Sequence, residues 1–379
     1  NAFVEWNIIK GLKFKSSFGI DIDYATNKSY NPRSVYSGSQ KNGEAKKISN
    51  NTYTWINENI LTYTNTCGVH SFKGMVGYTQ QQSAYDGFNA GSYGFLNDNL
   101  QMNNLGSGTT YTAPGSEVKK WALNSYLARV NYTVNNKYLL TASIRADGSS
   151  RFGENNRWGY FPSVSGAWYV TEEKFMKPLS SWLTNLKLRA SWGETGNMSI
   201  GNYASYGIVN GDNYVFGGIY SIGSKESTYG NPNLSWEKTS QVNLGLEIGL
   251  LNWLNVEVDV YKGMTSDMLL NVPVMEASGF STILQNIGKV ENKGLEITLG
   301  TNLKLGKVRW TNSFNYAMNR NKVKSLGSAS EMVTQANSVI DFIIKVGEPI
   351  GNYYTYVTDG VYKNQAEIET DVEIGRAHV

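Results

Sequence analysis

The side chains that most often carry out chemistry in proteins are scarce in this chain. It contains two histidines, His70 and His378, and one cysteine, Cys67. A zinc or histidine-based catalytic site would have to be built around His70 alone, and a single cysteine forms no disulfide within the chain. Glu172 and Glu173 are adjacent, so in a strand they would face opposite sides and would not act as a catalytic pair. We therefore predict that the chain is not an enzyme and holds no metal or cofactor.

Three charged residues lie close enough in sequence to form a ligand cluster. They are Asp147, Arg151 and Arg157. Asp147 and the acids near it lack the spacing of a calcium loop, and Gly217-Gly218 does not precede a helix as a phosphate-binding loop would. We interpret the three residues as parts of turns and salt bridges that fix a loop, with ligand binding as the alternative.

Aromatic residues gather in two long segments that are rich in glycine and polar residues. They are Tyr85, Phe88, Tyr93 and Phe95 in one segment, and Tyr214, Phe216, Tyr220 and Tyr229 in the other. Loops displayed by a rigid scaffold commonly carry ligand recognition. These rings could stack on sugar rings, contact a partner protein, or stabilise the loops themselves.

The composition favours long strands over helices. Of 379 residues, 40% are hydrophobic and 17% are charged, with 25 tyrosines, 39 glycines and only 7 prolines. The mean hydropathy is -0.37, and no apolar run approaches the ~18–20 residues of a membrane-spanning helix. A hydropathy scan does not detect barrel strands, because their apolar residues occupy only every second position. The net charge of +3 is too small to indicate a nucleic-acid partner.

Strict alternation marks the strands. From position 12 to position 24 the even residues are mainly apolar, from Leu12 through Ile20 to Tyr24, and the odd residues are mainly polar, from Lys13 to Asp23. Similar patterns predict twelve strands near 2–9, 12–24, 52–65, 70–82, 121–134, 137–146, 161–170, 185–193, 239–250, 253–263, 289–303 and 307–318. The first long strand exceeds the usual 5–6 residues of a soluble strand.

The connections between these strands alternate between short and long. Those at 10–11, 66–69, 135–136, 251–252 and 304–306 are tight, whereas 25–51, 83–120, 194–238, 264–288 and the region from 319 onward are long. This rhythm is typical of an antiparallel up-and-down transmembrane β-barrel, with short periplasmic turns and long extracellular loops. It requires 171–184 to be a longer periplasmic turn that contains a helical segment. Aromatics near strand ends, such as Tyr132, Tyr138, Trp253 and Trp310, fit the interfacial girdles of such barrels.

Both ends of the chain look unnatural for an outer-membrane protein. The chain starts at Asn1 without a signal peptide, which such a protein needs. The residues 374–379 are those that one frame of a common sequencing adapter would encode. We therefore expect 1–373 to be part of a barrel, and 374–379, including His378, to be a non-native tail.

Several motifs occur in order between roughly residues 120 and 370. They read RADGSSRFG (145–153), NRWGYFPS (156–163), LKLRASWGETGN (186–197), NPNLSWEKT (231–239), NIGKVENKGLE (286–296) and GEPIG (347–351), before Asp359-Gly360. As a set they resemble the SusC/RagA-type TonB-dependent receptors of the Bacteroidetes. The matching positions, which we interpret as structural, are Asp147, Gly148, Ser149, Ser150, Arg151, Phe152, Gly153, Trp158, Gly159, Phe161, Pro162, Gly196, Asn197, Asn231, Pro232, Asn292 and Gly294.

The resemblance implies a plugged outer-membrane barrel of about 22 strands, of which this chain would supply about twelve, without the plug. It also implies energy from the TonB complex, a SusD-like surface lipoprotein as partner, and uptake of an oligosaccharide or a peptide. The loop aromatics could then contact that lipoprotein. Two other functions remain as alternatives, a passive outer-membrane porin and a soluble or secreted β-rich glycan-binding protein.

Overall fold

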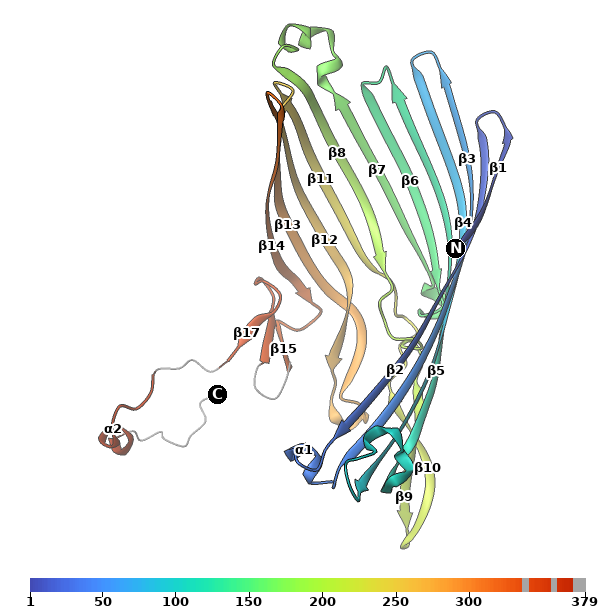
Figure 1. Cartoon of the computed structure of the whole chain (residues 1–379), viewed down its shortest axis with the longest axis vertical. Coiled ribbons are helices and arrows are strands. Elements are labelled where there is room, and N and C mark those ends of the chain that lie inside the picture. The colour runs from blue at the N-terminus through green and yellow to red at the C-terminus, as the bar shows by residue number, and fades with distance from the viewer. Residues whose placement is uncertain (336–340, 356–359, 371–379) are drawn as a thin grey trace.

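Twelve antiparallel strands lie side by side in one curved sheet (Figure 1) in a computed structural model that describes residues 1–335, 341–355 and 360–370. The strands are β1 (Ala2–Ile9), β2 (Leu12–Asn31), β3 (Glu44–Cys67), β4 (His70–Phe95), β5 (Gly108–Val134), β6 (Tyr138–Ser149), β7 (Trp158–Tyr169), β8 (Leu183–Asn197), β11 (Glu237–Leu250), β12 (Leu254–Pro273), β13 (Thr282–Leu305) and β14 (Val308–Leu326). Their order in the sheet is their order in the chain. The predicted all-β, up-and-down architecture is confirmed, as an open section of barrel wall with β1 and β14 at its two edges.

Most of the strands are longer than the alternation pattern predicted. β3, β4 and β5 contain 24, 26 and 27 residues, whereas a tilted strand crosses a membrane with about 9–11 residues. The extra length lies at the end of the sheet with the long connections, so the wall continues past the membrane on that side. We call this end the mouth.

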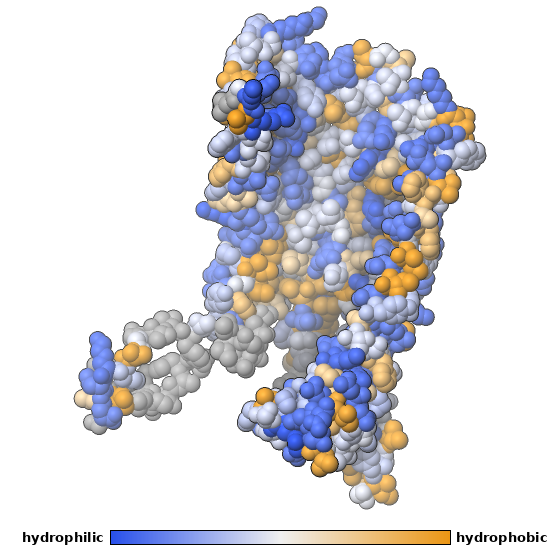
Figure 2. All heavy atoms as spheres, viewed as in Figure 1, coloured by the Kyte–Doolittle hydropathy of each residue, from blue (hydrophilic) through white to orange (hydrophobic). Residues whose placement is uncertain are grey.

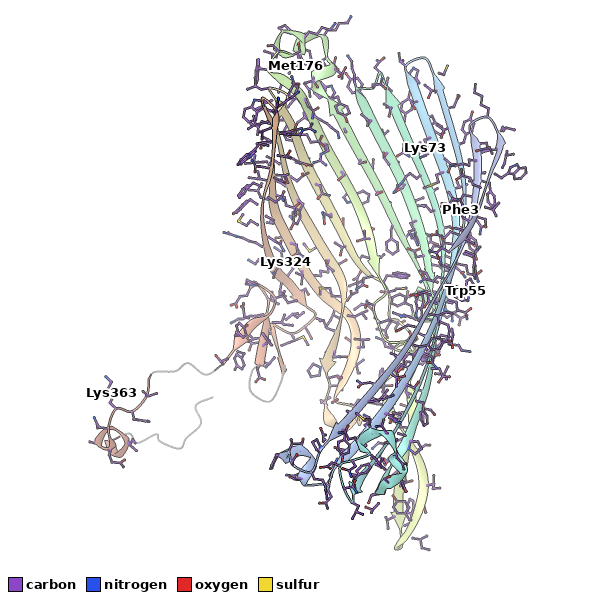
Figure 3. The ribbon with its side chains drawn as sticks, in the orientation of Figure 1. Phe3, Trp55, Lys73, Met176, Lys324 and Lys363 are labelled. Atoms are coloured by element: carbon purple, nitrogen blue, oxygen red, sulfur yellow. The ribbon has the colours of Figure 1, made fainter. Side chains whose placement is uncertain are left out.

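The opposite end carries the tight turns that the sequence predicted. Asn135 and Asn136 both have positive φ, at 53° and 56°, and so do Leu251 and Asn252, at 53° and 60°. Two such residues in succession give the twist that matches adjoining antiparallel strands. The longer turn between β7 and β8 contains 3-10 helical turns at Val170–Glu172 and Lys174–Leu179, and Figure 3 places Met176 at this same end.

The two faces of the sheet differ in chemistry along each cross-strand row. Residues paired across antiparallel strands point to the same side of a sheet. One row is apolar and consists of Leu188, Leu246, Val258, Ile297 and Tyr316. The neighbouring row, on the other face, is polar and consists of Lys187, Glu247, Glu257, Thr298 and Asn315. The apolar side is the outward face, which contacts lipid, and the polar side is the lumen face.

The colouring in Figure 2 agrees with this assignment, since hydrophobic residues gather along the flank where β1 and its neighbours lie. Exposed hydrophobic residues on that flank include Val4, Trp6, Phe18, Ile20 and Ile22. A surface of this kind is stable when hydrocarbon covers it. Among the described residues, no helix is long and apolar enough to cross a membrane.

Smaller elements occupy the long connections near the mouth. β9 (Ile208–Phe216) and β10 (Ile219–Thr228) form a separate hairpin, and β15 (Glu331–Gln335), β16 (Asp341–Lys345) and β17 (Asn352–Tyr354) form a three-stranded sheet. The helices are α1 (Tyr36–Ser39) and α2 (Gln365–Thr370), and further 3-10 turns lie at Gln101–Asn103, Leu105–Ser107, Glu154–Asn156 and Glu276–Ser278. The sequence predicts loops in these connections, and the structure adds these short strands. The proposed tail at 374–379 lies outside the described residues.

Candidate functional site

A small hydrophobic nucleus at the mouth gathers residues from several loops. Phe152 and Leu234 are fully buried, and Phe161 and Trp236 are nearly so. The ring of Trp236 lies 5.0 Å from that of Phe152 and 5.4 Å from that of Phe161, centroid to centroid. These contacts join the loop after β6 to β7 and to the segment before β11. Part of the signature motif therefore forms the packed centre of the loops at the mouth. We call these packed loops the rim.

Signature glycines allow the backbone to approach this nucleus. A β-carbon on Gly153 would overlap the carbonyl oxygen of Pro232, and one on Gly196 would overlap the ring of Phe161. Other signature glycines also lie against aromatic rings, Gly148 against Trp158, Gly159 against Phe161 and Trp236, and Gly294 against Tyr261. Glycine is needed here because of close approach.

Side-chain hydrogen bonds tie the same loops together. The Asn231 amide donates to the carbonyl of Leu284 at 2.8 Å, which links the segment before β11 to β13. The indole N–H of Trp236 donates to the carbonyl of Arg157 at 2.9 Å. Both side chains thus bind the backbone of a segment that is distant in sequence, and buried backbone groups are usually paired in this way.

The three charged residues of the predicted cluster have different partners. Asp147 accepts from the guanidinium of Arg145 at 2.7 Å. The guanidinium of Arg151 donates to the carbonyl of Met198 at 3.2 Å. Arg157 contributes its backbone carbonyl to the bond with Trp236. Asp147 thus has a partner on its own strand, whereas Arg151 reaches a distant loop. The choice between a structural and a ligand-binding role for the three residues stays a prediction.

Arg151 has a second contact of its own. Its guanidinium carbon lies 4.9 Å from the ring centroid of Trp121 on β5, a cation–π geometry. Burial lowers the pKa of Arg151 from its usual value, and its Nε is buried without a hydrogen-bond partner among the described residues.

The remaining signature residues lie in the ladders and turns around the nucleus. The N–H of Ser149 donates to the Arg157 carbonyl, and the hydroxyl of Ser150 accepts from the N–H of Ala122. Asn197 donates to the Glu237 carboxylate at 2.7 Å. The last three are in ladder positions, Pro162 opposite Ile144, Asn292 opposite Asn321 and Gly294 opposite Asn319.

A polar cavity of about 650 Å³ opens on the lumen face below the nucleus. Its walls come from β5 to β8 and β11, and they include Arg129, Arg145, Asp147, Gln241 and Asn243. Several donors and acceptors converge there beside the ring of Phe161. This mixture of apolar and hydrogen-bonding groups suits a polar ligand or a protein surface.

Closer to the periplasmic turns, the lumen face carries an ionic cluster that sequence reasoning missed. Arg189 lies 3.0 Å from Glu247 and 2.8 Å from Asp259, and it also contacts Glu257. Lys187 lies 3.1 Å from Glu247. The parity of these positions, opposite to the apolar residues of each strand, could have identified them as facing the lumen.

Most of the aromatics that the sequence assigned to loops lie on strands: Tyr85, Phe88, Tyr93 and Phe95 on β4, Tyr214 and Phe216 on β9, and Tyr220 on β10. Phe95 is buried against Tyr30, with ring centroids 5.5 Å apart. Tyr85 donates to Asn50 at 2.9 Å, and Lys41 lies 5.7 Å from the ring of Tyr93. Phe88, Tyr214, Phe216, Tyr220 and Tyr229 are exposed. Their role in recognition stays a prediction.

Another loop contact lies at the mouth end of β2. The hydroxyl of Tyr30 donates to Asp98 at 2.7 Å, and the guanidinium of Arg33 lies 3.3 Å from the same carboxylate. Desolvation and the hydrogen bond to Asp98 raise the pKa of Tyr30 to about 12. The bond from Tyr30 and those from Arg33 outweigh desolvation and lower the pKa of Asp98.

At the periplasmic turn, Glu173 is held by a different set of donors. Tyr138 donates to it at 2.6 Å, Lys137 at 3.1 Å and Trp168 at 3.2 Å. These bonds, led by that from Tyr138, lower the pKa of Glu173. The arrangement fixes two aromatic rings near the membrane surface, where rings of this type anchor barrels.

These sites are suited to binding and to mechanical stability. Among the residues that the structure describes, no group of three or more histidine, cysteine, aspartate or glutamate side chains could hold a metal ion. His70 hydrogen-bonds Tyr132 at 2.7 Å and stacks on its ring.

Comparison with known proteins gives one family over nearly the whole chain. The model for "TonB dependent receptor-like, beta-barrel" matches residues 2–372. TonB-dependent receptor P39 of Formosa agariphila is 34% identical over 364 residues, which are 95% of this chain and 34% of that protein. TonB-dependent receptor SusC of Bacteroides thetaiotaomicron is 32% identical over 81% of this chain and 33% of its own length. The chain thus spans about a third of the length of these relatives.

Solved structures agree with the sequence comparison. The RagAB peptide transporter matches with a TM-score of 0.80 and 32% identity, covering 92% of this chain and 38% of that one. The ferric citrate transporter FecA matches with a TM-score of 0.54 and 8% identity, over 89% of this chain and 46% of that one. The FecA match shows the fold alone.

Proposed function

This chain belongs to the TonB-dependent receptor β-barrels of the bacterial outer membrane, within the SusC/RagA-like group, and from that premise we propose that the whole protein imports an oligosaccharide through that membrane. On this proposal the TonB complex supplies the energy, and a SusD-like lipoprotein captures cargo at the mouth. The observation that carries the proposal is the match of nearly the whole wall to SusC- and RagA-type relatives.

The same proposal places further parts outside this chain. A barrel of about 22 strands with a plug in its lumen would contain these twelve strands as about half of its wall. The ionic cluster around Arg189 and the polar cavity beside Phe161 would then face the plug or the cargo, because both open on the lumen face. Residues 1–373 would belong to the barrel domain, with its mouth loops, and 374–379 would be a non-native tail.

A peptide is the second candidate cargo. It is favoured by one observation, the TM-score of 0.80 to a structure described as a peptide transporter. The polar cavity suits either class, since its donors and acceptors can bind hydroxyl groups or peptide groups.

Uptake by cells distinguishes these proposals. The full-length receptor and its neighbouring lipoprotein would be deleted separately in the source bacterium, and growth would be followed on defined oligosaccharides and peptide mixtures. We expect loss of growth on one class of cargo after either deletion, and the same loss when TonB is depleted. Unchanged uptake without TonB would contradict active import and would support a passive pore.

A further inference from the structure

On β12, β13 and β14, the last three strands of the twelve-stranded sheet, the outward face changes abruptly from apolar to basic. Val260, Leu295 and Met318 are cross-strand partners and form the last apolar row. Two residues further toward the mouth on each strand, the next row on this face consists of Lys262, Lys293 and Arg320. Between one outward row and the next, three hydrophobic side chains are thus replaced by three cations.

Further cations extend this row toward the mouth. Lys289, Lys322 and Lys324 are exposed on β13 and β14, and Figure 3 marks Lys324 toward the mouth end of β14. We call these six residues, Lys262, Lys289, Lys293, Arg320, Lys322 and Lys324, the basic row. The side chains of Lys262 and Lys293 are 60% and 58% exposed, so they are available to a ligand.

Acidic residues on these strands do not neutralise the basic row. Glu291 lies on the same face, opposite Lys322 in the ladder, and is contacted by Lys262 at 3.3 Å and by Lys293 and Lys324 at 3.2 Å. It is one carboxylate among six cations. Three other acids of the described β12–β14, Glu257, Asp259 and Glu296, occupy the lumen-face rows, and Asp267 lies in the irregular part of β12. The outward face therefore keeps an excess of positive charge.

The height of the basic row matches the surface of the outer leaflet. On β13 the outward apolar residues run from Leu303 to Leu295. Eight steps at ~3.3 Å give about 26 Å along a strand, or roughly 20 Å of height for a strand tilted by about 40°. The apolar band of such barrels is about 25 Å tall. Lys293 follows directly, on the mouth side, where lipid headgroups begin.

Other strands have a different chemistry at this boundary. On β4 and β5 the outward face passes from Val76 and Val130 to Tyr78 and Tyr126, and then to amides. The cations that directly follow the apolar band on β12, β13 and β14 are thus absent at the same boundary of β4 and β5. A general requirement of the interface would place cations there too.

We propose that the basic row binds the phosphate groups of a glycolipid in the outer leaflet. Arginine and lysine side chains are the usual protein ligands of phosphate, and cations at a membrane surface attract anionic headgroups. A lipid whose acyl chains lie against Leu295 and Met318 would place its phosphates at Lys293 and Arg320. The apolar surface fits the acyl chains of such a lipid, and the basic edge fits its phosphates.

The test compares two triple variants of the full-length receptor by native mass spectrometry in detergent. One is Lys293→Gln/Arg320→Gln/Lys322→Gln, and the control with the same loss of charge elsewhere is Lys28→Gln/Lys46→Gln/Lys307→Gln. The probes are phosphorylated lipid A, the same lipid without phosphate, and inorganic phosphate. The heat-dependent shift of the folded barrel on a gel checks that each variant has folded.

Each outcome is decisive. We expect the basic-row variant to bind phosphorylated lipid A at least about tenfold more weakly, given the effect of single cations at membrane surfaces, and the control to bind it like the wild type. Glu291→Gln should bind it more tightly, since three lysines lose their partner. Equal binding of both lipids by the wild type, unchanged binding by the basic-row variant, or equal preference for inorganic phosphate would overturn the proposal.

Discussion

The rings of Phe152 and Trp236 contact each other with centroids 5.0 Å apart, although one follows β6 and the other precedes β11. This contact is the centre of the rim, and both residues are almost completely buried. The rim is therefore a small folded core of its own, supported on the barrel wall.

Removing a ring from this core should loosen the whole rim. Phe152→Ala deletes a fully buried ring, which costs about 3–5 kcal/mol in protein cores. We expect the full-length receptor to lose its compact, heat-modifiable form at a clearly lower temperature. Ile222→Ala is the control, because Ile222 is 92% exposed. Equal behaviour of the two variants would show that the rim does not contribute to stability.

Close approach at Gly153 gives a second test. A methyl group there would meet the carbonyl of Pro232, and the strain of overpacking is typically about 1–3 kcal/mol. Gly153→Ala should therefore lower the unfolding temperature, whereas Gly211→Ala, at a position with nothing within 4 Å, should not. Thermal unfolding followed by tryptophan fluorescence would measure both. A neutral Gly153→Ala would mean that the two loops can separate at no cost.

The ionic cluster in the lumen should respond to the loss of its arginine. Arg189→Met leaves Glu247, Glu257 and Asp259 close together without their shared partner, and Arg189 is about a third exposed. Solvent screening reduces the full cost of breaking a buried pair, so we expect a loss of about 1–2 kcal/mol. Adding Glu257→Gln should restore part of it. Denaturant unfolding in low and high salt measures the effect, and a penalty independent of salt would contradict this explanation.

Acid and alkali should release the loop that Asp98 holds. Because its pKa is lowered in the folded protein, the stability that Asp98 provides is present above its ordinary pKa and disappears as pH falls through the lowered value. Tyr30 acts in the opposite sense. Its contribution is complete below its ordinary pKa and is lost as pH rises through about 12. Hydrogen exchange of 96–107 across this range measures both losses, and Asp98→Asn should abolish the one in acid.

The hairpin of β9 and β10 offers a test of cargo or partner recognition. Phe216 and Tyr220 are 67% and 70% exposed, and such rings supply contact area at an interface. We expect Phe216→Ala/Tyr220→Ala to reduce uptake of labelled cargo several-fold and to leave barrel stability unchanged. Tyr36→Ala is the control, because Tyr36 is also exposed but lies on α1. Normal uptake by the double variant would assign the rings to the hairpin itself.

The sequence predicted the strands where lipid demands alternation and underestimated them elsewhere. Leu12 to Tyr24 had to alternate because one side contacts hydrocarbon. Past the membrane both sides of β3 meet water, so Lys46 to Asn51 show no apolar face, yet ladder pairing continues through them. Pro114 and Gly115 likewise hid the start of β5.

The turn of the β9–β10 hairpin could be predicted from the sequence, but the packing of the rim could not. Gly217 and Gly218 stand between two β-rich runs, a pattern that predicts a two-residue hairpin turn, and both have positive φ. The motif around Phe152 indicated the family. Its contact with Trp236 could not be predicted, because it depends on how two distant loops fold over the wall. Lys262, Lys293 and Arg320 became one row only when the register was known.

The uninterrupted pairing of β3 with β4, from Glu44 opposite Tyr93 to Cys67 opposite His70, has a mechanical consequence. A tensile load along these strands is shared by all the rungs of the ladder at once, so no single hydrogen bond carries it. Such a wall yields far less readily to pulling along its length than to peeling from an edge. A protein complex that pulls on a domain inside the lumen would therefore move that domain while the surrounding wall keeps its shape.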